Sequence, residues 1–179
     1  METSDAVALA KIKELVLEEI AQAVAEGDYT GPEGSRLRAV ANKHAMERSR
    51  LYEMASNAYE EGDGERAKAL SDEAAMEGSK MREANKKAAE AIFNHRNDEN
   101  ETSIDLHGLT VAEALGFLKI RLQKLLSNEA QDELTCITGA GNHSPGQLAR
   151  IRPAVRKMCQ QNKLKCTDDD NPGTFVIHC

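Results

Sequence analysis

The sequence predicts an α+β protein, in which an N-terminal helical hairpin precedes a compact two-layer domain with the element order β-α-β-α-β-β. Up to about residue 97, apolar residues recur three or four positions apart between glycine-containing breaks, which is typical of helices that pack through one face. Beyond residue 102, short apolar stretches alternate with helical patterns. We therefore predict an amphipathic helix in residues 1–30, the hairpin in 31–97 and the two-layer domain in 98–179.

Three helices are expected in the first part of the chain. The first extends from about Ser4 to Ala25 and stops before Gly27, as a helix with a glycine after its last turn does. The other two, at 35–61 and 65–94, are joined by a turn at 62–64, so they should form an antiparallel hairpin. The seam of this hairpin is mostly alanine and glycine, which allows a close approach but buries little apolar area.

The second part alternates strands and helices. The predicted strands are Ser103–Leu106, Leu134–Ile137, Leu164–Thr167 and Thr174–His178. Thr110 and Glu113 form a capping box at the start of a helix that extends to Leu126. A second helix begins near Arg150 and ends near Asn162, which places Pro153 in the first turn, where proline is tolerated. We expect the two helices to cover one face of a mixed sheet.

Charge is distributed unevenly between the two parts. The net charge of the whole chain is −7, which argues against a general binder of polyanions. Residues 1–101 hold 14 Lys and Arg against 22 Asp and Glu, whereas residues 102–179 hold 9 against 8. A nucleic-acid site is therefore expected in the C-terminal part, where the acidic excess disappears.

The cysteines and the apolar stretches indicate in which cellular compartment the protein is expected. The four cysteines form no C-x-x-C pair, so we expect reduced thiols instead of a disulfide framework or a zinc site. No apolar stretch is long enough to span a bilayer, and no signal peptide is evident. These features predict a soluble cytoplasmic protein, with the nucleus as the alternative, that does not bind membranes.

Asp105 and His107 are the candidate catalytic residues. Because side chains alternate along a strand, both should lie on the face opposite Ile104 and Leu106, near the carboxyl end of the strand. An aspartate beside a histidine can orient the imidazole ring, which then serves as a general base or acid. Taken alone, a D-x-H sequence favours the other interpretation, in which both side chains bond only to nearby backbone at the end of a strand.

The second candidate segment is the glycine loop between a strand and a helix. Glycines at such a position let backbone N–H groups approach a phosphate, and arginines follow in the next helix. An ordinary strand-to-helix turn is the alternative interpretation. The candidate nucleic-acid-binding residues are Thr138, Gly139, Gly141, Asn142, His143, Arg150 and Arg152.

Taken together, the I-D-L-H-G segment at 104–108 and the I-T-G-A-G-N-H-S segment at 137–144 closely resemble the Smr domain. This family is similar to the C-terminal domain of certain MutS relatives. The resemblance extends from about Ser103 to the C-terminus. Residues 35–96 also resemble a helical segment of unknown function that often precedes Smr domains in eukaryotic proteins.

The resemblance implies a fold like that of the C-terminal domain of bacterial translation initiation factor three, and endonuclease activity on RNA or DNA. It ties Asp105 and His107 to cleavage, and Gly139 and Gly141 to substrate binding. This sequence differs from the family pattern at two positions. Thr138 stands where relatives of the MutS type have histidine, and Ala140 stands where many others have arginine or lysine. Loss of a loop cation weakens phosphate contact unless His143 and the helix arginines compensate.

Three functions remain open at this point. The first is an endoribonuclease that needs no metal or other cofactor, because RNA supplies its own 2′-OH nucleophile. The second is a DNA-nicking enzyme, in which a divalent cation bound by Asp105 activates water. The third is an RNA-binding or ribosome-binding adaptor with little catalysis. RNA is thus the expected partner, with DNA as the alternative, and the helical half of the chain, which has an acidic excess, is expected to serve as a scaffold or to contact a ribosome or a protein.

Overall fold

The computed structural model describes residues 30–97, 102–127, 133–139, 149–171 and 173–178. The helix predicted at residues 4–25 lies outside the described residues. The chain forms two compact units, Met1–Ala91 and Ile92–Cys179, and the division falls within a helix. In the described part of the chain, no helix is both long enough and apolar enough to cross a membrane.

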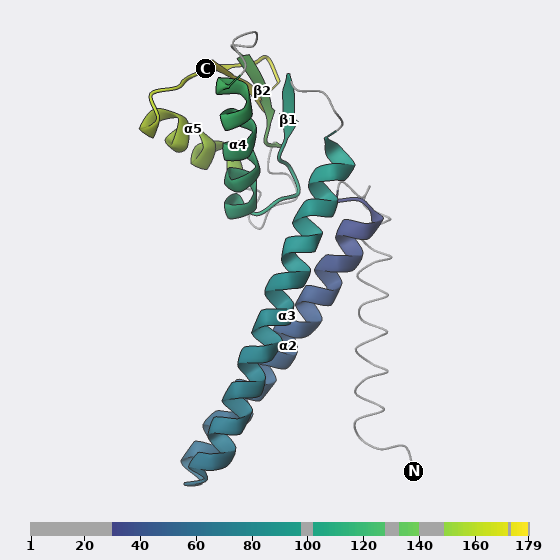
Figure 1. The fold of residues 1–179 in the computed structure, drawn as a ribbon, viewed down its shortest axis with the longest axis vertical. Coiled ribbons are helices and arrows are strands. Elements are labelled where there is room, and N and C mark those ends of the chain that lie inside the picture. Colours follow the sequence, from purple (N-terminus) through teal and green to yellow (C-terminus); the bar gives the residue numbers. More distant parts are fainter. Residues whose placement is uncertain (1–29, 98–101, 128–132, 140–148, 172, 179) are drawn as a thin grey trace. The chain divides into compact units, whose positions relative to one another are not determined.

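The predicted hairpin is confirmed as two long antiparallel helices, α2 (Pro32–Glu60) and α3 (Gly64–Arg96) (Figure 1). Gly62 has a positive φ of 82° in the turn, and the Asp63 N–H group donates to the Ala58 carbonyl, which closes α2 as a glycine cap does. Helix α2 begins earlier than predicted because Gly31 is its N-cap and Pro32 its first residue, a position that suits proline. The buried seam is rich in small residues, among them Ala41, Ala55, Ala58, Ala74, Gly78, Ala84 and Ala88.

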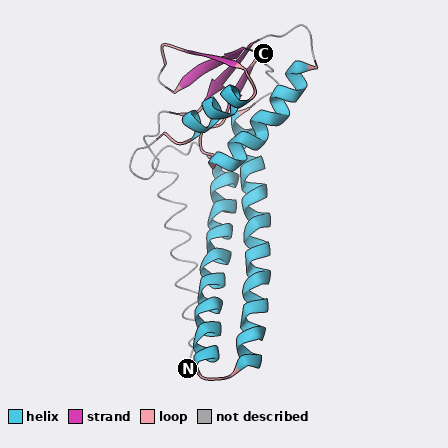
Figure 2. Cartoon of the chain, turned by 90° about the vertical axis from the view of Figure 1, so that its left-hand side faces the viewer, coloured by secondary structure: helices cyan, strands magenta, loops and turns pink. Residues whose placement is uncertain are grey.

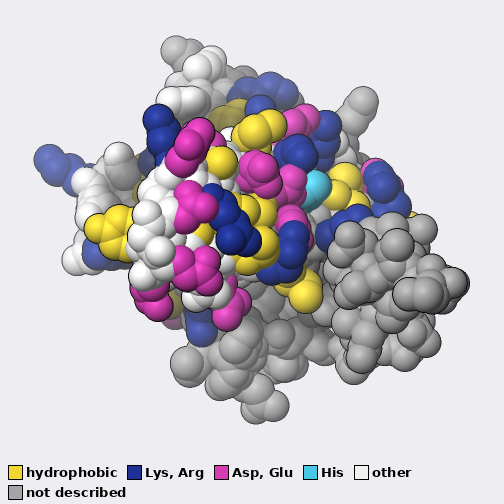
Figure 3. Space-filling model, turned by 90° about the horizontal axis from the view of Figure 1, so that it is seen from below, with side chains coloured by type: hydrophobic (Ala, Val, Ile, Leu, Met, Phe, Trp, Pro, Cys, Tyr) yellow, Lys and Arg dark blue, Asp and Glu magenta, His cyan; other side chains and the backbone are white. Residues whose placement is uncertain are grey.

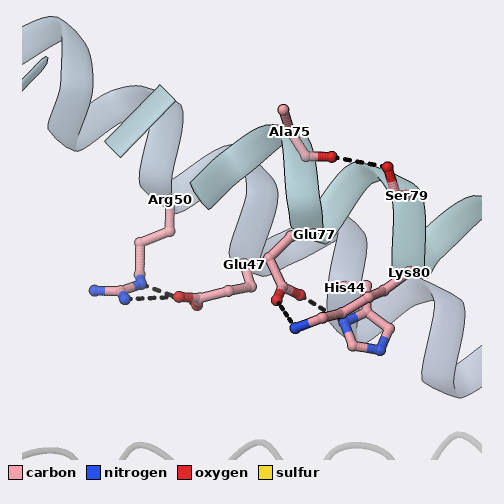
Figure 4. A network of polar contacts seen from close by, with 7 residues as sticks. All are labelled: His44, Glu47, Arg50, Ala75, Glu77, Ser79 and Lys80. Atoms are coloured by element: carbon pink, nitrogen blue, oxygen red, sulfur yellow. Dashed lines mark hydrogen bonds and ion pairs between the residues drawn. The ribbon is translucent and has the colours of Figure 1, made fainter. Parts of the chain in front are cut away.

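Polar contacts flank this seam of small residues. His44 of α2 contacts Glu77 of α3 through Nδ1 and Oε2 at 2.6 Å, and Lys80 donates to the same carboxylate at 2.7 Å (Figure 4). Hydrogen bonds lower the pKa of Glu77 below its ordinary value, and the bond from Lys80 has a larger effect than the bond from His44. Arg50 and Glu47 form a separate pair along α2. On the face that Figure 3 presents, acidic and basic side chains of the described residues are interspersed.

The second unit contains a four-stranded sheet covered on one side by two helices (Figures 1 and 2). The strands are β1 (Ser103–Asp105), β2 (Glu133–Ile137), β3 (Lys165–Asp168) and β4 (Thr174–His178). Their order is β1-β2-β4-β3, and only the β1–β2 pair is parallel, so the predicted mixed sheet is confirmed. The helices are α4 (Val111–Leu126) and α5 (Ile151–Gln161). The capping box of Thr110 and Glu113 is present, and Pro153 lies in the first turn of α5.

The core of this unit lies between the sheet and its helices. Ile104, Cys136 and Phe175 are register partners across β1, β2 and β4, and all three are fully buried. Most residues next to them in the strands, including Asp105 and Ile137, point to the opposite face and are only partly buried, whereas Thr174 is buried. Helices α4 and α5 complete the core through Ala114, Leu118, Leu122, Leu125, Val155, Met158 and Cys159.

The cysteines that the structure describes are free thiols, as predicted. Cys136 and Cys159 are buried, and burial raises the pKa of the Cys136 thiol well above its ordinary value. Cys166 is half-buried, and Cys179 lies outside the described residues. The buried thiols therefore act as small apolar side chains of the core.

Candidate active site

Asp105 and His107 form a close pair at the carboxyl end of β1. His107 Nδ1 lies 2.5 Å from Asp105 Oδ1, and the backbone N–H of His107 donates to the same oxygen at 3.0 Å. Because an ionised carboxylate can only accept hydrogen bonds, the proton of a neutral imidazole is on Nδ1 and the lone pair is on Nε2. The side chain of Asp105 is 14% exposed and that of His107 is 26% exposed, so solvent reaches both groups only in part.

The sequence around the pair explains why it is held firmly. Ile104 and Leu106 are both fully buried and fix the strand on the core side. Asp105 lies opposite Ile137 in the parallel register, and the Leu106 N–H donates to the Ile137 carbonyl at 2.8 Å. The alternation of buried and polar residues therefore directs the carboxylate away from the core, toward His107.

Gly139 brings the glycine loop against His107. Its φ is +73°, a conformation that residues with a side chain rarely adopt. A Cβ atom at this position would lie only 3.1 Å from the Cβ of His107. Gly108, directly after the histidine, also has a positive φ of 81°. The two segments singled out in the sequence thus lie next to each other at Gly139 and His107, and a side chain at position 139 would crowd the histidine.

Thr138 anchors the start of the same loop to Gly173. Its N–H and its hydroxyl group both donate to the Gly173 carbonyl, at 2.8 and 3.3 Å, and its side chain is buried. In this structure the Thr138 hydroxyl group bonds to the protein backbone. The predicted contact of Thr138 with nucleic acid stays a prediction. Three further predicted binding residues, Gly141, Asn142 and His143, lie outside the described residues, as does Ala140.

Both parts of the chain match known families. The Smr domain model matches residues 104–171, and the model of a domain of unknown function, DUF1771, matches residues 35–97. A Smr domain-containing protein of Schizosaccharomyces pombe is 33% identical over 147 residues, which cover 82% of this chain and 71% of that protein. This chain belongs to the Smr domain family.

Two further relatives of this Smr protein are informative. Endonuclease NBR9 of Saccharomyces cerevisiae is 31% identical over 150 residues, which cover 83% of this chain and 62% of that protein. The solution structure of the B3BP Smr domain is 38% identical, with a TM-score of 0.43, and the match covers 54% of this chain and 96% of that domain. This Smr protein is therefore homologous to a protein named as an endonuclease.

The predicted arginines of the Smr domain differ in their surroundings. Arg150 is exposed at the N-cap of α5. Arg152 forms an ion pair with Asp168. Arg156, which is not among the predicted binding residues, pairs with the same carboxylate. Both guanidinium groups also lie over the ring of Phe175, at 5.7 and 5.5 Å from its centroid. Hydrogen bonds from these two arginines lower the pKa of Asp168.

Sequence reasoning missed Asn97, which bonds directly to the backbone of Asp105. The Asp105 N–H donates to Asn97 Oδ1 at 2.8 Å, and Asn97 Nδ2 donates to the Asp105 carbonyl at 2.8 Å. The same Nδ2 donates to the Phe93 carbonyl at 2.9 Å. Asn97 follows the predicted end of the helix at residue 94 and precedes the strand predicted from Ser103, where a polar residue is ordinary, so nothing in the sequence marked it.

No metal-binding constellation was predicted in the sequence. Within the described ranges, no three His, Cys, Asp or Glu side chains are grouped so that they could hold a metal ion.

Proposed function

We propose that this Smr protein is an endoribonuclease in which His107 acts on the 2′-OH group of RNA. The contact between the imidazole of His107 and the carboxylate of Asp105 carries the proposal. It fixes the ring and leaves the Nε2 lone pair as the basic group. The homology to a protein named as an endonuclease supports the same reaction class.

The proposed reaction needs only groups of the protein and the RNA. Nε2 of His107 accepts the proton of the 2′-OH group, and the 2′-oxygen attacks the adjacent phosphorus. The bond from phosphorus to the 5′-oxygen breaks, and the leaving oxygen takes up the proton that the His107 imidazolium releases, which gives a 5′-OH end and a neutral imidazole. The other product carries a 2′,3′-cyclic phosphate. Asp105 keeps the ring oriented and stabilises the imidazolium that forms.

Substrate binding is assigned to the loop beside His107. The Gly139 backbone packs against the histidine, so a phosphate held by this loop lies next to the base. We propose that Thr138, Gly141, Asn142 and His143 extend the same binding segment. Arg150 and Arg152 are proposed to contact the phosphates further along the strand, for which Arg152 must leave Asp168.

A single 2′-deoxy substitution tests the proposal. The parent protein is incubated, in EDTA, with an RNA oligonucleotide and with the same oligonucleotide carrying one deoxyribose at the mapped cleavage position. We expect cleavage of the RNA to 2′,3′-cyclic phosphate and 5′-OH ends, and no cleavage at the deoxyribose. Cleavage there, or cleavage that requires Mg²⁺ and nicks plasmid DNA, would establish the DNA-nicking alternative. Tight RNA binding without any cleavage would establish the adaptor.

A further inference from the structure

We infer that Asn97 is a positioning residue of this site, acting on Asp105 and through it on His107; the inference rests on the proposed function. The amide of Asn97 pairs with both backbone polar groups of Asp105, as a neighbouring strand would. Asp105 then holds His107 through its side chain. The imidazole is thus linked to the end of α3 by two consecutive sets of hydrogen bonds.

The chemistry of this contact requires an amide. Oδ1 of Asn97 accepts from the Asp105 N–H, whereas Nδ2 donates to two carbonyl groups, those of Asp105 and Phe93. Both Nδ2 hydrogens are therefore used. A carboxylate of the same shape keeps the acceptor but places a negatively charged oxygen against two carbonyl oxygens. Aspartate is accordingly the substitution that changes the chemistry with the least change in volume.

The position of β1 in the sheet explains why such a contact matters. Strand β1 has only three residues and lies at the edge of the sheet, paired on one side with β2. The Asp105 N–H and carbonyl groups point to its unpaired side, where Asn97 meets them. On the other side, Leu106 bonds to Ile137. Asn97 therefore bonds to β1 on the side away from β2 and limits movement of the Asp105 backbone.

The last turn of α3 is itself fixed within the same compact unit. Ile92 begins this unit and is fully buried. The ring of Phe93 stacks on that of Phe117 in α4, with centroids 4.1 Å apart and planes at 5°. Asn97 is also the last residue that the DUF1771 model matches. The final residue of the helical family thus contributes to the site of the Smr domain.

The chain itself provides a matched control for a test of Asn97. Asn162 ends α5 with the same local contact, an Nδ2 donor to the carbonyl four residues earlier, at 2.8 Å. The described contacts of its side chain include none with Asp105 or His107. Asn97→Asp and Asn162→Asp therefore remove the same helix-end bond, but only the first also alters the strand of the site.

Two measurements on these variants separate positioning from folding. Steady-state RNA cleavage is measured in EDTA, and 1H NMR follows the downfield Nδ1 proton of His107, assigned by its loss in Asp105→Asn. We expect Asn97→Asp to lower kcat between about 10-fold and 100-fold with KM nearly unchanged, as for a misplaced reacting group. The Nδ1 resonance should shift or broaden. Asn162→Asp should leave both readouts at parent values.

The possible outcomes each decide the inference. If Asn97→Asp keeps the parent kcat and the parent resonance, Asn97 has no positioning role. If Asn97→Asp does not fold, Asn97→Ala removes the amide without adding charge and is judged by the same two readouts. If the parent protein does not cleave RNA, the proposed function fails, but the resonance in Asn97→Asp relative to Asn162→Asp still tests the contact with Asp105.

Discussion

The two regions of this chain each contain a histidine bonded to a carboxylate, but the His44–Glu77 and His107–Asp105 pairs have different surroundings. The distance between the bonded atoms is 2.6 Å for His44 and Glu77, and 2.5 Å for His107 and Asp105. The exposed fractions are also similar, at 25% and 16% in the hairpin and 26% and 14% in the Smr domain. Distance and burial alone therefore do not distinguish the two pairs.

The environments of the two carboxylates make the difference. The carboxylate of Glu77 bonds to His44 through one oxygen and to Lys80 through the other, on a flank of the hairpin (Figure 4). Asp105 is held through its backbone by Asn97, and its carboxylate bonds to both the ring and the N–H of His107. The fixed backbone of Asp105 and the glycine loop beside His107 are therefore why the proposed catalytic pair is His107 and Asp105 and not His44 and Glu77.

The largest effect is expected from changing the carboxylates. Asp105→Asn replaces the acceptor of the Nδ1 hydrogen bond and should lower RNA cleavage by at least about 100-fold, since positioned acid–base catalysis contributes that much or more. Glu77→Gln makes the same chemical change in the hairpin and should leave the cleavage rate within twofold of the parent. Initial rates on a labelled RNA oligonucleotide measure both. Equal losses in the two variants would remove the distinction between the pairs.

A smaller effect is expected from the glycine beside His107. Gly139→Ala combines a strained positive φ with a Cβ atom 3.1 Å from the Cβ of His107, so it should displace the ring and lower cleavage by about 10-fold or more. Gly62→Ala has nearly the same φ, but open space around the new Cβ. It should cost about 1 kcal/mol of stability and leave cleavage unchanged. Circular dichroism measures the stability of both variants, and cleavage assays measure their activity. Unchanged activity in Gly139→Ala would argue against the contact between the loop and His107.

The smallest effect concerns the stability of the hairpin and its pH dependence. Lys80 and His44 lower the pKa of Glu77 in the folded state, so this carboxylate stabilises the fold above its ordinary pKa. The contribution is lost as pH falls below that value toward the lowered pKa of the folded state. Glu77→Gln should therefore unfold more easily than the parent near neutral pH, by about 0.5 kcal/mol, and the difference should shrink below about pH 4.5.

Glu83→Gln is the matched control for this pH dependence. Glu83 is an exposed residue of the same helix, and its only described partner, Lys87, lies one turn away. Removing that pair should have less effect on unfolding than Glu77→Gln, because no residue of α2 is involved. Urea unfolding followed by circular dichroism at several pH values measures both variants. A pH-independent difference between the parent and Glu77→Gln would contradict the proposed contribution of the carboxylate.

The sequence predicts local features of this molecule better than contacts between elements. The strand at 103–105, the capping box at Thr110 and the small-residue seam follow from spacing along the chain, and the structure has each of them. The contact of Asp105 with His107 is likewise local, because the residues are two apart. Asn97 is different, because its role depends on how α3 ends beside β1, which no spacing rule describes.

The arginines of α5 illustrate the same limit. Their position in a helix that follows the glycine loop was evident, and it led to the prediction that Arg152 contacts nucleic acid. Their engagement with Asp168 was not evident, because that residue lies 16 positions from Arg152 and approaches it only through the pairing of β3 with β4. Long-range contacts of charged side chains are therefore where the structure adds most to the sequence.

The most direct test of the difference between the two pairs is the side-by-side cleavage of RNA by His107→Gln and His44→Gln in EDTA. Glutamine preserves much of the size of histidine but removes the basic ring nitrogen. We predict that His107→Gln loses at least about 100-fold in rate and no longer produces 2′,3′-cyclic phosphate ends, whereas His44→Gln matches the parent. Parent-like cleavage by His107→Gln would show that the reactive base lies elsewhere.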